Sequence, residues 1–150
     1  MSFWDNVDEK DTHPDLSALI SDPNPDYEAI LQTPDLFRTF KSKDDNLLSF
    51  MLTKTTFEKI LSIMMENINS KISKACVELF IAKDSPMLKE LIEKPSYTEF
   101  LIKLAEKSAG SNDLVKLGYV SRIYQKAVED DSTQKGLVNL FNSNIYIIFN

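Results

Sequence analysis

The sequence contains a single cysteine and a single histidine, and this shortage excludes several kinds of site. Cys76 alone cannot form a disulfide framework, and its apolar neighbours predict a small buried residue. His13 precedes Pro14 in a polar stretch, so a catalytic triad would depend on a poorly positioned base. Metal sites that need several histidines or cysteines cannot be built from one of each. We therefore expect no metal site.

Glycine is also scarce, with three in 150 residues. Gly110, Gly118 and Gly136 stand far apart, so the sequence has no glycine-rich phosphate loop. Runs of β-branched residues between turn signals are rare too, which favours helices over strands. We expect Gly118, which lies inside a helical pattern, to allow two helices to approach closely. Carboxylate pairs such as Asp44-Asp45 stand at helix boundaries, and we expect neither catalysis nor a bound cofactor.

No targeting or membrane segment is evident. The first residues lack the basic and apolar regions of a signal peptide, and no uninterrupted apolar run is long enough to span a bilayer. We expect a cytoplasmic protein with no membrane partner.

Acidic charge is concentrated at the start of the chain. Residues 1–30 hold eight acidic residues and one lysine, whereas the other 120 residues carry 15 acidic and 16 basic ones. Residues 1–12 also lack periodicity, which predicts an extended acidic arm, either solvated or docked on a basic partner surface. No stripe of lysine and arginine with interleaved aromatics is present, so we expect no nucleic-acid partner.

Phe3 and Trp4 are the most unusual residues of this acidic arm. Two large aromatic side chains in a polar segment either fold back on the core or anchor a partner protein. They are the residues that we predict to bind a protein.

Helical periodicity covers the rest of the chain, and we expect residues 13–150 to form one domain. Pro25, Pro34, Pro86 and Pro95 each precede or open a helical pattern, where the missing N–H of proline costs nothing. The expected short helices span about 14–21, 25–32, 34–41, 44–53 and 85–93. Longer helices are expected from Phe57 and from Tyr97, and each is followed by a second helix, over about 69–82 and 112–129. The stretches 55–58 and 96–99 are typical of capping boxes.

One apolar pattern recurs at an interval of 40 residues. The pattern, with spacing i, i+3, i+4, i+7, comprises Phe57, Ile60, Leu61, Met64; Tyr97, Phe100, Leu101, Leu104; and Leu137, Leu140, Phe141, Asn144. Two-helix units at this period are typical of HEAT or armadillo repeats. We therefore predict an all-α fold of degenerate HEAT/armadillo-like repeats, an α-solenoid. The alternative is an irregular helical bundle whose helices have similar lengths.

Several stretches resemble the SAPS-domain family. They are Phe3-Trp4, residues 27–31, Asp35-Leu36, Lys41 with residues 46–50, and residues 74–80 around Cys76. The family's lysine after asparagine is Leu47 here, and Val77 interrupts its Ala-Cys-Glu order. SAPS proteins are longer helical-repeat regulatory subunits of protein phosphatase 6-type enzymes. The resemblance implies a non-catalytic scaffold that binds a serine/threonine phosphatase catalytic subunit and directs it to substrates. The alternative is a helical-repeat adaptor for another protein.

The last residues, 144–150, form an apolar run without a polar cap. A solenoid needs a polar outer face on its terminal repeats. We therefore expect either a piece of a longer scaffold, with the third repeat truncated, or self-association through residues 137–149.

Overall fold

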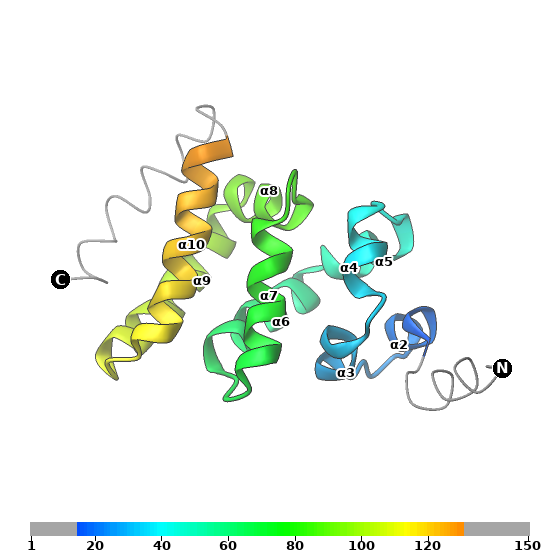
Figure 1. Cartoon of the computed structure of the whole chain (residues 1–150), viewed down its shortest axis with the longest axis horizontal. Helices are drawn as coiled ribbons and strands as arrows, with labels where there is room; N and C mark the ends of the chain where they lie inside the picture. Colours follow the sequence, from blue (N-terminus) through cyan, green and yellow to red (C-terminus); the bar gives the residue numbers. More distant parts are fainter. Residues whose placement is uncertain (1–14, 131–150) are drawn as a thin grey trace, which may run out of the picture. The chain divides into compact units, whose positions relative to one another are not determined.

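The computed structural model describes residues 15–130, and these residues contain nine α-helices and no strand (Figure 1). The predicted all-α class is thus confirmed. The described residues divide into two compact units, one ending at Met51 and the other beginning at Leu52. The expected arm of residues 1–12 and the third copy of the apolar pattern lie outside the described residues.

The first unit consists of four short helices. They are α2 (Leu16–Ser21), α3 (Tyr27–Gln32), α4 (Leu36–Lys41) and α5 (Asp45–Met51). Each packs on the next, and α2 also contacts α5, so the four form a closed cluster. The rings of Tyr27 and Phe50 stack with their centroids 6.2 Å apart.

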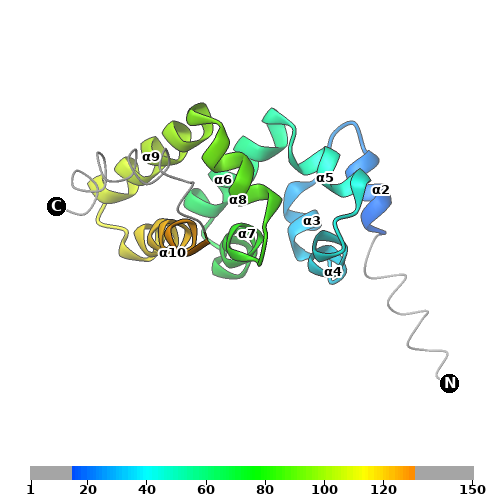
Figure 2. The same cartoon turned by 90° about the horizontal axis from the view of Figure 1, so that it is seen from above.

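The second unit contains two helical hairpins and one additional helix. Its elements are α6 (Lys54–Glu66), α7 (Ser70–Ile81), α8 (Pro86–Glu93), α9 (Pro95–Gly110) and α10 (Leu114–Asp130). Helix α6 pairs with α7, and α9 pairs with α10. The two hairpins then pack like on like: α6 contacts α9, and α7 contacts α10 (Figures 1 and 2). Helix α8 lies against α7 and α9.

The recurring apolar pattern joins the two hairpins. Phe57 is fully buried, Tyr97 is nearly so, and their rings stack with centroids 4.2 Å apart. Phe57 also meets Phe80 of α7 edge to face, so it is packed between its own hairpin partner and the next hairpin. Leu61 and its counterpart Leu101 are both fully buried.

The helix boundaries confirm the role of proline and correct the predicted capping boxes. Pro86 and Pro95 occupy the first turns of α8 and α9. Thr53 and Lys94 cap α6 and α9, neither through a side-chain hydrogen bond, so the helices begin before the predicted boxes. Helix α9 begins before its predicted capping box because the φ angle of Pro95 already suits the first helical position. The hydroxyl of Thr98, which lies within the predicted box of residues 96–99, donates to the Leu91 carbonyl at 2.7 Å and does not cap the helix.

One expectation about glycine needs correction. A Cβ on Gly118 would meet no atom of a neighbouring helix within 4 Å in the described part of the chain, so Gly118 marks no close helix contact. The left-handed turn positions are occupied by Lys43, Asp84 and Asn112, with φ between 54° and 59°. Asn and Asp tolerate this conformation better than most residues, which explains how the chain turns with so few glycines.

Candidate interaction surface

Phe3 and Trp4, the residues predicted to bind a partner, lie outside the described residues. Much of the resemblance to the SAPS family falls on the interior instead. Leu31, Leu36, Leu47 and Cys76 are all buried. The described part of that resemblance therefore reflects packing, and the surface must be built from other side chains.

Four large apolar side chains are exposed in the described residues. Ile68 is fully exposed, and Leu114, Val115 and Val128 are 76%, 61% and 46% exposed. Ile68 lies in the turn between α6 and α7. Leu114 and Val115 open α10, directly after the turn from α9. Apolar side chains that gather on a surface are typical of interaction sites, so this end of the second unit, with Ile68, Leu114 and Val115, is a candidate contact surface.

The two turns are held side by side by two lysines. The Lys107 ammonium lies 3.0 Å from a Glu66 carboxylate oxygen, an exposed ion pair between α9 and α6. Lys116 of α10 reaches further and donates to the backbone oxygens of Asn67 at 2.6 Å and Met64 at 3.3 Å. Its third contact is the Ser73 hydroxyl of α7, at 2.9 Å. We call this set of contacts the Lys116 junction.

Electrostatics suit a cation at the Lys116 junction. The backbone oxygens at the carboxyl end of α6 carry the negative end of the helix dipole, which attracts an ammonium group. Partial burial of Lys116 lowers its pKa below the ordinary value, whereas Asp113 and Cys76 act in the opposite direction. The ammonium also lies 5.5 Å from the centroid of the Tyr119 ring. The junction thus fixes the register of the second hairpin against the first.

Cys76 and Tyr119 lie close to this junction. Cys76 is completely buried, as the sequence predicted, and burial raises the pKa of its thiol to about 12. The opposing effect of Lys116 on this pKa is smaller. The Tyr119 hydroxyl is buried and has no hydrogen-bond partner among the described residues.

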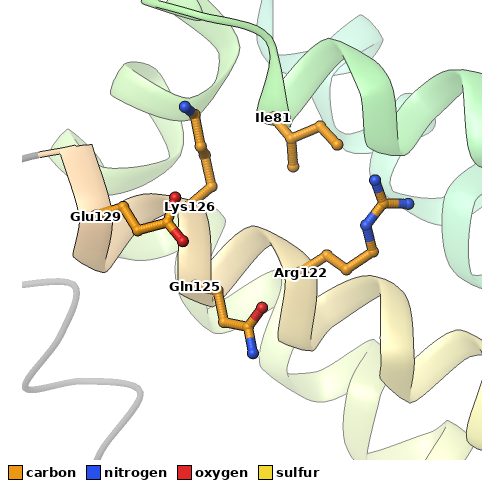
Figure 3. A pocket seen from close by; sticks show the side chains of 5 residues that line it. All are labelled: Ile81, Arg122, Gln125, Lys126 and Glu129. Atoms are coloured by element: carbon orange, nitrogen blue, oxygen red, sulfur yellow. The ribbon is translucent and has the colours of Figure 1, made fainter.

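A shallow hollow of about 180 Å³ lies between the end of α7 and the second half of α10 (Figure 3). Its lining consists of Ile81, Arg122, Gln125, Lys126 and Glu129. In Figure 3, Arg122 and Lys126 extend from α10 on either side of Ile81. Long flexible side chains make most of the wall, and Arg122, Gln125 and Glu129 are exposed, so the hollow is an open feature of the surface.

Asp44, one of the carboxylates singled out in the sequence, has a local structural role. Asp44 accepts a hydrogen bond from the Leu47 amide at 3.0 Å and so caps α5, as expected for an acid at a helix start. Within residues 15–130, no group of three or more His, Cys, Asp or Glu side chains could hold a metal ion. None of the described helices is both long and apolar enough to cross a membrane.

The Lys116 junction was not recognised from the sequence. The only signal was the loose match of residues 74–76 with 116–118 at an offset of 42. That match makes Lys74 and Lys116 equivalent, yet Lys74 is exposed and Lys116 is partly buried. Only the packing of the second hairpin on the first distinguishes them.

Comparison with known proteins gave no relative: no family model, no curated protein and no solved structure matches this chain.

Proposed function

We propose that this chain is a non-catalytic helical scaffold that binds a partner protein through the end of its second unit. The observation that carries the proposal is the pair Ile68 and Val115, two exposed aliphatic side chains on adjoining turns. The Lys116 junction and the pair Lys107–Glu66 hold these turns together. A contact surface that is already ordered loses little conformational entropy when a partner binds.

Lys71 and Lys74 determine the kind of partner that fits. Both are exposed on the first turns of α7, directly after Ile68. An apolar centre beside cationic side chains complements a protein surface with an apolar anchor and acidic groups around it. We define Ile68, Val115, Lys71 and Lys74 as the turn surface.

A more specific form of the proposal identifies the partner. By the resemblance to SAPS subunits, the partner would be a protein phosphatase 6-type catalytic subunit, and Phe3 and Trp4 would add a second anchor. This form depends on the sequence resemblance. The general form depends on the turn surface and on the like-on-like packing of two hairpins, which is the arrangement of HEAT and armadillo repeats.

A binding experiment tests both forms. The full chain and an Ile68→Asp/Val115→Asp variant would be immobilised, and retained proteins identified from cell extract and then tested as purified partners. We expect the double substitution to weaken binding at least tenfold, because each aspartate places a charge in an apolar contact. Thr55→Asp is the matched control, since Thr55 is exposed at the opposite end of α6.

The outcomes separate the two forms. Binding of a purified phosphatase 6-type catalytic subunit that depends on Ile68 and Val115 supports the specific form. Another partner with the same dependence supports the general form alone. A partner that binds wild type and the double variant equally contradicts the turn surface.

A further inference from the structure

Helices α7 and α10 run side by side in the same direction. Near their starts, the Lys116 ammonium of α10 bonds to Ser73 of α7. Near their ends, Ile81 of α7 and the second half of α10 line the same hollow. In Figure 2 the two helices form one row of the second unit, and α6 and α9 form the other. The surface of this row therefore continues from the turn surface to the hollow.

One sector of α10 points away from the interior of the second unit. Its members follow the spacing 3, 4, 3, 4 and, at about 100° per residue, lie within about 80° of the helix circumference. They are Val115, Gly118, Arg122, Gln125 and Glu129. All are exposed except Gly118, which is half-buried, whereas the fully buried Val120 and Ala127 lie on the opposite side of the helix. We call this sector the outer face of α10.

The hollow gives the outer face a positively charged end beside an apolar wall. In Figure 3, Arg122 and Lys126 extend on either side of Ile81, and Glu129 lies at the Lys126 end. Within residues 15–130, the Arg122 guanidinium forms no ion pair. Ile81 suits the methylene groups of a glutamate, and a guanidinium binds a carboxylate through two parallel hydrogen bonds. A phosphate group would carry more negative charge toward Glu129, so the hollow favours a carboxylate.

Gly118 lies between the turn surface and the hollow. Glycine weakens a helix relative to alanine, and Gly118 does not adopt a left-handed conformation that would require it. A Cβ at this position would meet no other helix in the described part of the chain. The missing side chain therefore leaves room on the outer face, where the backbone of a partner can approach α10 closely.

The spacing along the outer face indicates the shape of the partner. Val115 and Arg122 are seven residues apart, which is about 10.5 Å along the helix axis. A partner helix repeats its own face at the same interval, so an aliphatic and an acidic side chain seven residues apart would reach both positions. In an extended peptide, side chains of one face recur at about 6.6 or 13 Å, which matches less closely.

We propose that the outer face of α10 binds an amphipathic helix of the partner protein, with a glutamate of that helix in the hollow against Arg122. An aliphatic residue seven positions away packs on Val115, and the backbone of the partner helix passes over Gly118. The inference rests on the proposed function and specifies the partner segment that the turn surface receives.

A displayed library tests the inference with a probe of defined shape. One outer helix of a stable three-helix scaffold would be randomised at three positions spaced i, i+4 and i+7, and binders would be selected on the full chain. We expect enriched helices to carry a glutamate at one end of this triplet and a large aliphatic residue at the other. Arg122→Glu should weaken the enriched binder about tenfold, because repulsion replaces attraction.

Charge reversal on both sides makes the test specific. Replacing the glutamate of the binder with lysine should weaken binding to wild type and restore binding to the Arg122→Glu protein. Gly118→Leu should also weaken the binder about tenfold without lowering the melting temperature, because leucine favours a helix but blocks the close approach. Lys103→Glu is the matched control: Lys103 is exposed on α9, in the other row, and its reversal should leave binding unchanged.

Three results would overturn the inference. A selection that yields no helix distinguishing wild type from Arg122→Glu, or only helices without an acidic residue, would show that the hollow takes no carboxylate. A binder displaced by inorganic phosphate, but not by chloride at the same ionic strength, would identify a phosphate site. An Arg122-dependent dimer of the full chain, measured by light scattering, would make a second copy the occupant. Each leaves the proposed function standing, because dependence on Ile68 and Val115 is measured separately.

Discussion

At the scale of single residues, Lys116 makes three hydrogen bonds that the sequence analysis did not predict. Its ammonium satisfies backbone oxygens at the end of α6 and the hydroxyl of Ser73, and so ties α10 to the first hairpin. Hydrogen bonds to a charged group are stronger than those between neutral groups. Partial desolvation of the ammonium opposes this gain, which is why the pKa of Lys116 is lowered.

Replacing Lys116 with Met should lower the free energy of unfolding by about 2 kcal/mol. The methionine keeps the apolar stem but leaves the Asn67 and Met64 oxygens without their charged donor. Urea denaturation followed by circular dichroism measures the change. Lys74→Met is the matched control, and we expect a change within about 0.5 kcal/mol because Lys74 is exposed. Equal effects at both positions would contradict the structural role of the junction.

Cys76 should make stability depend on pH in alkaline solution. Its pKa is about 12 in the folded chain and 9.0 in its ordinary environment. Between these values the thiol ionises only in the unfolded state, so its stabilising contribution is complete below pH 9 and is lost as pH rises toward 12. The slope reaches about 1.4 kcal/mol per pH unit.

The comparison is between wild type and Cys76→Ala, with the free energy of unfolding measured from pH 7 to 11. Wild type should lose stability relative to the variant above pH 9, and the two curves should run parallel below it. The lowered pKa of Lys116 has the opposite effect, because it makes the free energy of unfolding rise with pH just below the ordinary pKa of lysine. Lys116 is present in both proteins, so this effect cancels in the comparison. Parallel curves throughout would show that the thiol titrates normally.

At the scale of elements, the residues at the helix starts explain which predicted helix starts were correct and which were wrong. Pro86 and Pro95 set the starts of α8 and α9, and Ser85 caps α8 by accepting from the Leu88 amide at 3.2 Å. The Ser85 hydroxyl also donates to the Leu79 carbonyl, so one side chain joins the end of α7 to the start of α8. The capping-box patterns failed because each lies inside a helix that had already begun.

Gly118→Ala should stabilise the protein by about 0.5–1 kcal/mol. Gly118 is helical, its φ is not left-handed, and an added Cβ meets open space rather than a neighbouring helix. Alanine loses less backbone entropy than glycine when a helix forms. Thermal unfolding of the full chain gives the measurement. Destabilisation would show that a close helix approach exists at this position after all.

At the scale of the whole molecule, the described residues form two compact units, and the second is organised as a pair of hairpins. The contacts between hairpins are aromatic at Phe57 and Tyr97 and polar at the Lys116 junction. Aromatic stacking contributes beyond the buried area, and the polar contacts fix the register. The proposed turn surface depends on this packing.

A double-mutant cycle on Phe57→Leu and Tyr97→Leu should give a coupling energy of about 0.5–1.5 kcal/mol. The stacked rings, 4.2 Å apart, lose their mutual interaction once either is replaced. Phe80→Leu with Tyr97→Leu serves as a reference, because Phe80 stacks edge to face with Phe57 and the structure gives no ring contact between it and Tyr97. A coupling near zero for Phe57 with Tyr97 would mean that the hairpins pack without this contact.

The sequence by itself determined the helices, most of their boundaries, the buried state of Cys76, and the apolar pattern to which Phe57 and Tyr97 belong. These follow from local chemistry: apolar spacing along a helix, proline at helix starts, and the scarcity of glycine and β-branched runs. Only the tertiary structure distinguished Lys116 from Lys74, placed Ile68 beside the start of α10, and showed open space at Gly118. The physical reason is that a lysine's burial and a glycine's surroundings depend on residues some 40 positions away, and their approach is decided by how one hairpin packs on the other.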